Sequence, residues 1–258
     1  SQYESSYQDP DLILSLNSTG VGKSTDWGET WTNVEVPDGN WANLNSRDIS
    51  ISDANPRFIW AGGYMGNFSK IYVSSDWGDS YNPVNNFTNE NGFVMGTISG
   101  IYTHPIEDST AYVLFSYYGF PKIVKREDLG NTWKDISGFA SLDEGISVSS
   151  TGFPNVGVYS LLVMPHNTDI IWVGTDIGLI ESTDGGENWY LVESNMPYTA
   201  IYDLKVKDQG QVIITTHGAG LWTATIEDLK SFIPKPATLP PVIDLSLIHI
   251  SEPTRRRG

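Results

Sequence analysis

The chain has 258 residues, a net charge of −16 at pH 7 and no cysteine. This charge excludes a nucleic-acid-binding protein, because no basic surface is available to neutralise phosphates, and it disfavours an anionic membrane surface. Without cysteine there is neither a disulfide framework nor a thiolate metal site, and no run of about 18 apolar residues is present to insert into a membrane.

Short apolar and aromatic runs alternate with turn residues along the chain. The sequence contains 25 Gly, 14 Pro, 9 Trp and 13 Tyr, and its Thr, Val, Ile, Tyr and Trp residues recur in runs bounded by Gly, Asn, Asp and Pro. This pattern is typical of strands and turns, so we predict an all-β protein. The predicted strands, in chain order, are 12–16; 48–52, 58–62, 70–74 and one from Tyr81; 97–103, 111–116, 122–126 and one from Trp133; 158–164, 170–175, 178–182 and 189–193; and 200–206, 211–216 and 221–226.

An eight-residue motif, Ser-x-Asp-x-Gly-x-x-Trp, occurs four times, and its aspartates are separated by 50, 52 and 56 residues. The third copy has Arg126 in place of Ser, and the second has Tyr81 in place of Trp. The motif residues are Ser24, Asp26, Gly28 and Trp31; Ser74, Asp76, Gly78 and Tyr81; Asp128, Gly130 and Trp133; and Ser182, Asp184, Gly186 and Trp189.

The motif predicts a tight turn between two strands. Asp can accept hydrogen bonds from the amides of its own turn, and Gly supplies a positive φ. Four short antiparallel strands in about 50 residues match one propeller blade. We therefore predict a β-propeller fragment of three whole four-stranded blades flanked by two partial ones, because the first group begins at its second strand. A ring needs about four to eight blades, so we expect more blades before Ser1.

Three segments are expected along the chain. Residues 1–230 form the propeller fragment, and residues 231–244, with four prolines, have the composition of a linker that would lead to a further domain. Residues 245–258 match the frame translation of a transposase adapter from sequencing-library preparation. We expect this tail to be an artefact, so its three arginines are not read as a functional patch.

The four motifs resemble the Asp-box (BNR) repeats of the sialidase-like superfamily, and the resemblance covers residues 9–228. It is greatest to xyloglucanase-type glycoside hydrolases and sortilin-like propellers of secreted bacterial proteins. The resemblance implies an extracellular or cell-surface location and a purely structural role for the Asp boxes. It is specific for the fold and weakly specific for function.

Meander topology places the loops between second and third strands on the same face as the links between blades, opposite the Asp boxes. Aromatic side chains near short polar ones on that loop face suit a sugar, whose C–H faces stack on rings while its hydroxyls form hydrogen bonds. The candidate ligand-binding residues are Trp41, Tyr64, Tyr117, Tyr118, Phe120 and His217.

Glycoside hydrolysis needs two carboxyl groups flanking the scissile bond. Asp143, Glu144 and Asp176 are the candidates; a partner acid in blades outside the chain is the alternative left open, so no catalytic pair is assigned. The sialidases of the family bind the substrate carboxylate with three arginines. Outside the tail the sequence has Arg47, Arg57 and Arg126; Arg57 is expected on the opposite face and Arg126 takes the motif Ser position, which disfavours sialidase activity. No cofactor and no metal site is expected, since the histidines are far apart and the Asn-rich stretch 82–91 lacks calcium-loop spacing.

Three functions remain open from the sequence. The first is a module that binds a polysaccharide or an extracellular protein and has no complete active site. The second is a xyloglucanase-like glycoside hydrolase whose carboxylates are shared with further blades, and the third is a sortilin-like scaffold for protein interactions. A carboxyl pair facing the central channel would distinguish the second from the others.

Overall fold

The computed structural model describes residues 3–6, 8–36, 41, 48–66, 70–88, 96–127, 132–139, 149–207 and 210–231. Besides strands and connections, the described residues include a short helical turn, η2, at Asp228–Ser231. The strands are β1 Tyr3–Ser5, β2 Ile13–Leu16, β3 Gly20–Ser24, β4 Thr32–Glu35, β5 Asp48–Ile51, β6 Ile59–Gly62, β7 Tyr72–Ser74, β8 Asn82–Pro83, β9 Gly100–Thr103, β10 Ala111–Leu114, β11 Ile123–Arg126, β12 Lys134–Asp135, β13 Val158–Val163, β14 Ile171–Thr175, β15 Gly178–Ser182, β16 Tyr190–Leu191, β17 Ile201–Lys207, β18 Gln211–Thr216 and β19 Leu221–Thr225.

These strands form five antiparallel sheets in sequence order, which we call blades 1 to 5. Blades 1 to 4 have four strands each (β1–β4, β5–β8, β9–β12 and β13–β16), and blade 5 has three, β17–β19. The predicted all-β class and the blade pattern are confirmed. Blade 1 needs a correction, because β1 pairs with β2 and completes a sheet that the sequence analysis counted as partial. The strand was missed because Tyr3-Glu4-Ser5 contains no apolar run.

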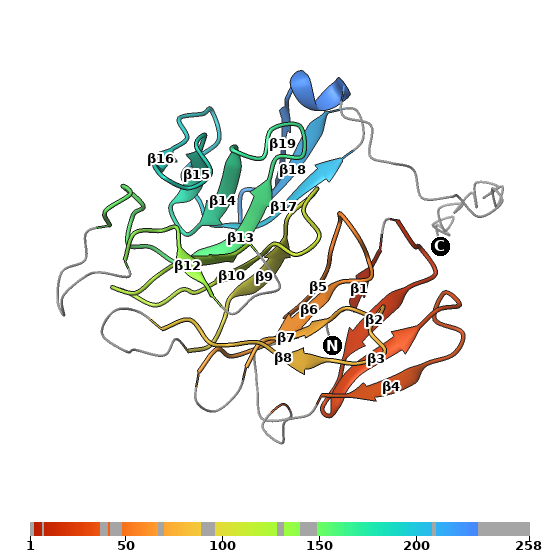
Figure 1. Cartoon of the computed structure of the whole chain (residues 1–258). Helices are drawn as coiled ribbons and strands as arrows, with labels where there is room; N and C mark the ends of the chain where they lie inside the picture. Colours follow the sequence, from red (N-terminus) through yellow and green to blue (C-terminus); the bar gives the residue numbers. More distant parts are fainter. Residues whose placement is uncertain are drawn as a thin grey trace, which may run out of the picture.

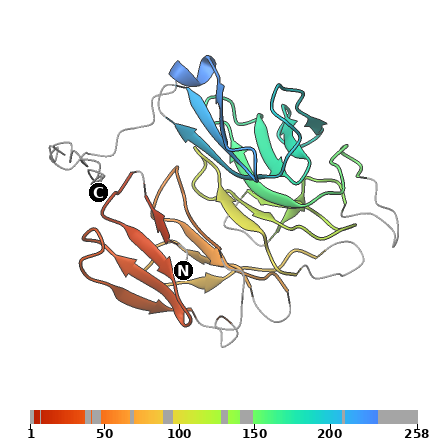
Figure 2. The same ribbon diagram turned by 180° about the vertical axis from the view of Figure 1, so that it is seen from behind.

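The blades radiate from their first strands (Figure 1; Figure 2 shows the same arrangement from behind). Strands β1, β5, β9, β13 and β17 are innermost, and each contacts the first strand of the next blade. Apolar side chains fill the spaces between consecutive blades in four separate clusters. The core therefore lies between sheet faces rather than along one continuous interior, as expected when each sheet buries both of its faces.

The repeated motif forms the turn between the third and fourth strands of a blade. In blades 1, 2 and 4 the motif Ser hydroxyl accepts the Gly amide at 2.8, 2.8 and 2.9 Å, and it donates to the motif Asp at 2.8, 2.7 and 2.8 Å. The Asp also accepts the amide four residues further on, at 2.9, 2.9 and 2.8 Å. The Gly residues have positive φ in all three turns. In blade 3, Asp128 and Gly130 lie outside the described residues.

In blades 2 to 4 the aromatic residue at the end of the motif packs against the preceding blade, whereas Trp31 of blade 1 is exposed and donates to the Gly28 carbonyl at 3.0 Å. Trp133 donates its indole N–H to the Asn85 carbonyl at 2.7 Å, and Trp189 donates to that of Ile136 at 2.8 Å. Arg126, in the Ser position of blade 3, is buried, and its guanidinium lies 5.7 and 5.5 Å from the ring centroids of Trp60 and Trp133. This arginine is thus held in the core by two indole rings.

Two sets of connections lie at opposite ends of the strands. The motif turns share one end with the turns between first and second strands, as shown by hydrogen bonds from the Gly185 amide to the Asp169 carbonyl and from the Trp77 amide to that of Arg57. We call this end the box face. The loops between second and third strands and the links between blades share the other end, called the loop face. No helix in the described part of the chain is long and apolar enough to span a membrane.

Candidate functional site

Two tyrosines occupy equivalent positions at the loop-face ends of neighbouring inner strands. The strand register shifts between Val158 and Ser160 in blade 4 and between Ile201 and Asp203 in blade 5. A β-bulge of this kind leaves one residue unpaired and re-aims its side chain. The residues at the two bulges are Tyr159 and Tyr202, and their ring centroids are 4.8 Å apart.

His217 extends this tyrosine pair. Its ring meets that of Tyr202 edge-on, with 5.6 Å between centroids. The backbone around it is held by the link between blades 4 and 5, because the His217 amide donates to the Ala200 carbonyl at 2.8 Å and the Thr199 hydroxyl donates to the His217 carbonyl at 2.8 Å. His217 and Tyr202 are exposed and Tyr159 is half-buried, so the three rings form a surface open to solvent.

Asp176 lies beside the tyrosine pair, in the short loop between β14 and β15. Its amide donates to the Gly157 carbonyl at 3.1 Å, and its carboxylate accepts the Gly157 amide at 3.3 Å. A Cβ atom placed on Gly157 would lie 3.0 Å from the Tyr159 hydroxyl and 3.4 Å from the Asp176 carboxylate, so both groups crowd this glycine. Burial, then Asp176 and Tyr202, raise the pKa of Tyr159. The hydroxyl thus stays protonated and remains a hydrogen-bond donor.

Lys122 supports an aromatic loop next to this group. Its ammonium donates to the Tyr117 carbonyl and lies 5.9 and 5.5 Å from the ring centroids of Tyr118 and Phe139. Burial lowers the pKa of Lys122 to about 8, and Asp176 opposes that change. The Gly119 amide donates to the Asn155 side chain at 2.9 Å, which ties the loop to the link before blade 4.

The sequence-predicted aromatic residues divide into two kinds. Tyr118 and Phe120 are exposed on the loop above Lys122, while Tyr117, also exposed, accepts the Thr97 amide on its hydroxyl at 2.8 Å and braces the loop. Trp41 is 1% exposed, donates to the Asn17 carbonyl at 2.9 Å and packs edge-on against Tyr72. Trp41 is therefore a packing residue, contrary to the ligand-binding role predicted for it.

The remaining candidates contribute less to the geometry. Tyr64 is half-buried and pairs through its backbone with Thr97, which joins the blade 2 loop to the following link. Asp143 and Glu144 lie outside the described residues. Tyr159 and Tyr202 were missed by the sequence analysis, although Val158-Tyr-Ser-Leu161 and Ile201-Tyr-Asp-Leu204 repeat the same order of side chains at matching points in two blades.

The group formed by Tyr159, Tyr202, His217 and Asp176 is called the tyrosine site. It combines ring faces with a carboxylate, a phenol donor and an imidazole, an arrangement suited to hold a ligand that has both apolar faces and hydroxyl groups. Asp176 is the one carboxyl group that we assign to this site, whereas hydrolysis of a glycosidic bond uses two. Among the described residues, no group of three or more His, Cys, Asp and Glu side chains is arranged to hold a metal ion.

No protein-family model matches the sequence, and no curated protein matches it. Several solved structures match this chain in fold. A GH74 xyloglucanase from Xanthomonas campestris superposes with a TM-score of 0.58 at 14% identity, covering 86% of this chain and 36% of that one. An ancestral GH74 enzyme gives a TM-score of 0.52 at 16% identity, with 86% and 30% covered.

An extracellular domain from B. thetaiotaomicron, assigned to a hybrid two-component system, gives a TM-score of 0.51 at 13% identity, with 85% and 26% covered. The chain thus spans between 26% and 36% of the length of these three proteins. At such identities the likeness concerns the fold alone. Together with the five radiating sheets, it shows that this chain has a β-propeller fold.

Proposed function

We propose that the chain is part of an extracellular Asp-box propeller that binds a glycan at the tyrosine site. The observation that carries the proposal is the pair of bulges that turns Tyr159 and Tyr202 toward each other from neighbouring blades, 4.8 Å apart. Neither ring is needed to fill the clusters between blades, which consist of other residues. Two strands of one fold therefore depart from regular pairing at the same point and present two aromatic rings to solvent.

The chemistry of the site favours a neutral sugar. A pyranose presents C–H faces that pack on aromatic rings and hydroxyl groups that need polar partners. Tyr202 and His217 supply ring surfaces, and Asp176 and the Tyr159 hydroxyl supply an acceptor and a donor. The exposed rings of Tyr118 and Phe120 offer a second contact on the neighbouring blade. Xyloglucanases among the structural neighbours support a polysaccharide as the first ligand to test.

Binding is preferred to hydrolysis as the proposed activity of this chain. Asp176 has no second carboxyl group assigned beside it, and its contacts with Gly157 are those of a residue that closes a loop. The same proposal includes an extracellular location and membership of the Asp-box family. It also includes a structural role for the motif residues, a propeller that ends at residue 230 and a linker that ends at residue 244. No feature of this site specifically favours the third function, a sortilin-like scaffold for protein interactions.

The test uses the whole chain and a panel of soluble polysaccharides that includes xyloglucan, xylan and alginate. Isothermal titration is expected to show saturable binding of at least one neutral glycan. Tyr202→Ala should weaken that binding about tenfold or more, since a stacked ring contributes about 1–3 kcal/mol of buried contact. Tyr190→Ala, which removes an exposed tyrosine from β16, should leave it unchanged.

Two results would remove the proposal. One is the absence of binding to every polysaccharide by a chain whose circular dichroism shows folded β-structure. The other is equal loss of affinity in Tyr202→Ala and Tyr190→Ala. Release of reducing ends from a bound polysaccharide, abolished by Asp176→Asn, would replace binding by hydrolysis.

A further inference from the structure

The loop between β10 and β11 presents two aromatic rings to solvent. Tyr118 is 75% exposed and Phe120 is 37% exposed, and neither belongs to the clusters between blades. We call residues 116–121 the aromatic loop. Because a large ring stabilises a fold when it is buried, these two rings contribute little to the core.

The aromatic loop is fixed to blade 4 and to the link before that blade. The Ser116 hydroxyl donates to the Val158 carbonyl at 2.7 Å and accepts the Val158 amide at 3.1 Å. The Gly119 amide donates to the Asn155 side chain at 2.9 Å, and φ at this glycine is 73°. Because these bonds set the backbone before a ligand arrives, binding at the loop costs little conformational entropy.

Lys122 supports the aromatic loop from within the fold. It is 0% exposed, and its ammonium donates to the Tyr117 carbonyl and lies 5.9 Å from the ring centroid of Tyr118. An ammonium next to a ring holds that ring in place. Since this charge is buried under the loop, a ligand meets the ring of Tyr118 and not a cation. The loop therefore suits a neutral ligand that has apolar faces.

The aromatic loop and the tyrosine site share one short segment, the link between blades 3 and 4. Asn155 and Val158 hold the loop, and Gly157 between them is crowded by the Tyr159 hydroxyl and the Asp176 carboxylate. Residues 155 and 157 are two peptide units apart, so their Cα atoms lie within about 7 Å of each other. The two aromatic surfaces are therefore neighbours on the loop face.

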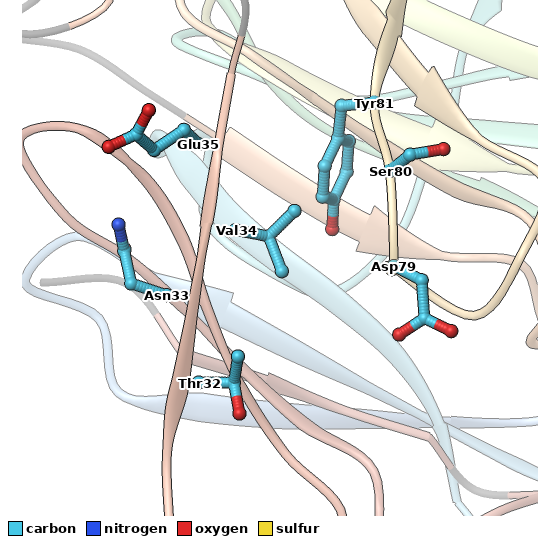
Figure 3. Close-up of a pocket in the computed structure, with 7 residues that line it drawn as sticks. All are labelled: Thr32, Asn33, Val34, Glu35, Asp79, Ser80 and Tyr81. Atoms are coloured by element: carbon cyan, nitrogen blue, oxygen red, sulfur yellow. The ribbon is translucent and has the colours of Figure 1, made fainter.

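A hollow on blades 1 and 2 does not combine these features. It lies between β4 and the motif turn of blade 2 (Figure 3). The aromatic side chain in its lining, Tyr81, is 3% exposed, and Asp79 is paired with Lys23 at 2.6 Å. Figure 3 shows the Glu35 carboxylate directed away from Asp79 and Tyr81. We assign no ligand to this hollow, because its ring is covered and its carboxylates do not converge.

We propose that the tyrosine site and the aromatic loop bind consecutive units of one sugar chain, so that the ligand is an extended neutral glycan rather than a single sugar. This inference rests on the glycan-binding function proposed above. Tyr118 and Phe120 stack on units next to those held by Tyr202 and His217. The exposed Asp176 carboxylate and the overall charge of −16 disfavour an acidic polysaccharide.

The test measures how the affinity of the whole chain depends on the length of the sugar chain. The probes are soluble xyloglucan and xylan, each with fragments of two, four and eight backbone units, in isothermal titration. For at least one of these glycans the affinity should rise about tenfold or more from the two-unit to the eight-unit fragment, because the longer fragment reaches both surfaces. The intact polysaccharide should bind with an affinity per site close to that of the eight-unit fragment.

Variants assign the two surfaces to different parts of the sugar chain. Tyr118→Ala combined with Phe120→Ala should weaken binding of the eight-unit fragment about tenfold. It should leave the two-unit fragment unchanged, since the polar groups of the tyrosine site hold the shorter fragment. Tyr202→Ala should weaken binding of both fragments, and Tyr190→Ala, which removes an exposed ring from β16, should change neither. Circular dichroism checks that each variant is folded, and Tyr118→Ala alone is the milder change should the double variant unfold.

The outcomes separate this inference from the function on which it rests. Equal affinity for the two-unit and eight-unit fragments of a polysaccharide that binds would overturn the inference and leave glycan binding in place. Equal weakening of both fragments by the loop variants would also overturn it, because the loop would then not contact a separate part of the chain. Absence of binding to every probe by the folded chain would remove the proposed function and this inference together.

Discussion

The two ends of the blades differ in regularity: the turns of the box face repeat from blade to blade, and the connections of the loop face do not. At the box face, three turns repeat the same hydrogen bonds to within 0.1 Å between corresponding donor and acceptor atoms. At the loop face, the connections between second and third strands run from the two residues 176–177 to the nine residues 63–71, and the side chains they present differ from blade to blade. The repeated features hold this fold together, whereas the departures from the repeat distinguish one blade from another.

The box face also contains a departure from its own repeat. The turns of blades 1 and 2 depart from that of blade 4 at one position, where an exposed Trp replaces Gly185. The two tyrosine bulges are departures of the same kind on inner strands that otherwise pair regularly. The positive φ of Trp27 and Trp77 is unfavourable for a bulky residue, and none of these tryptophans and tyrosines belongs to the clusters between blades.

The largest effect is expected from a repeated residue in the core. Trp189 is 3% exposed, packs edge-on against Phe153 at 5.1 Å and donates to the Ile136 carbonyl. Trp189→Ala should lower the free energy of unfolding by about 3–5 kcal/mol, because it leaves a cavity and an unpaired carbonyl between blades 3 and 4. Urea unfolding followed by circular dichroism measures this change in the free energy of unfolding. Tyr190→Ala, at the exposed next position, should change the free energy of unfolding by no more than about 0.5 kcal/mol.

A smaller effect is expected from the motif carboxylate of blade 4. Hydrogen bonds from the Asn188 side chain and amide lower the pKa of Asp184. Such a group stabilises the fold above the carboxyl pKa of the unfolded chain, and this contribution is lost as the pH falls through the lower folded-state pKa. Asp184→Ala should cost about 1–2 kcal/mol near pH 7 through the lost hydrogen bonds.

In urea unfolding measured from pH 7 down to pH 2, the difference between Asp184→Ala and the unchanged chain should shrink below about pH 4. A difference that stays constant down to pH 2 would show that the carboxylate charge has no part in the turn.

An effect seen only at higher pH is expected at the axis, between the two faces. Burial, opposed by Lys205 and reinforced by Asp48, Asp53 and Asp203, raises the pKa of Glu4 on β1 to about 7. The folded chain therefore keeps a proton that the unfolded chain releases at lower pH, and the fold loses stability as the pH rises toward 7. Glu4→Gln should match the unchanged chain at pH 4 and melt several degrees higher at pH 8. A lower melting temperature at pH 8 would contradict the raised pKa.

The sequence predicts the repeated part of this molecule well for a physical reason. The hydrogen bonds of each motif turn join residues within about five positions. Ser182, Asp184 and Gly186 therefore fix the conformation of their turn without contacts from other parts of the chain. The blade order follows in turn, because successive short strands pair with their neighbours.

The loop face depends on contacts between blades, which a local pattern does not contain. Trp41 was predicted to bind a ligand, and it is buried and packs against Tyr72 of the next blade. Tyr159 and Tyr202 face each other only because both strands bulge at the same point, and the extra residue of a bulge leaves no distinct signature in a run such as Val158-Tyr-Ser-Leu161. Repetition of that order in blade 5 was the signal present in the sequence.

The central claim is that the two bulged tyrosines form the ligand surface and that the repeated residues only support it. The most direct measurement is ¹⁹F NMR of the whole chain labelled with 3-fluorotyrosine, with resonances assigned by single Tyr→Phe variants, during titration with the glycan found to bind. We expect the resonances of Tyr159 and Tyr202 to shift together and saturate together, while that of Tyr190 stays in place. Saturable shifts at Tyr190, with Tyr159 and Tyr202 unmoved, would contradict it.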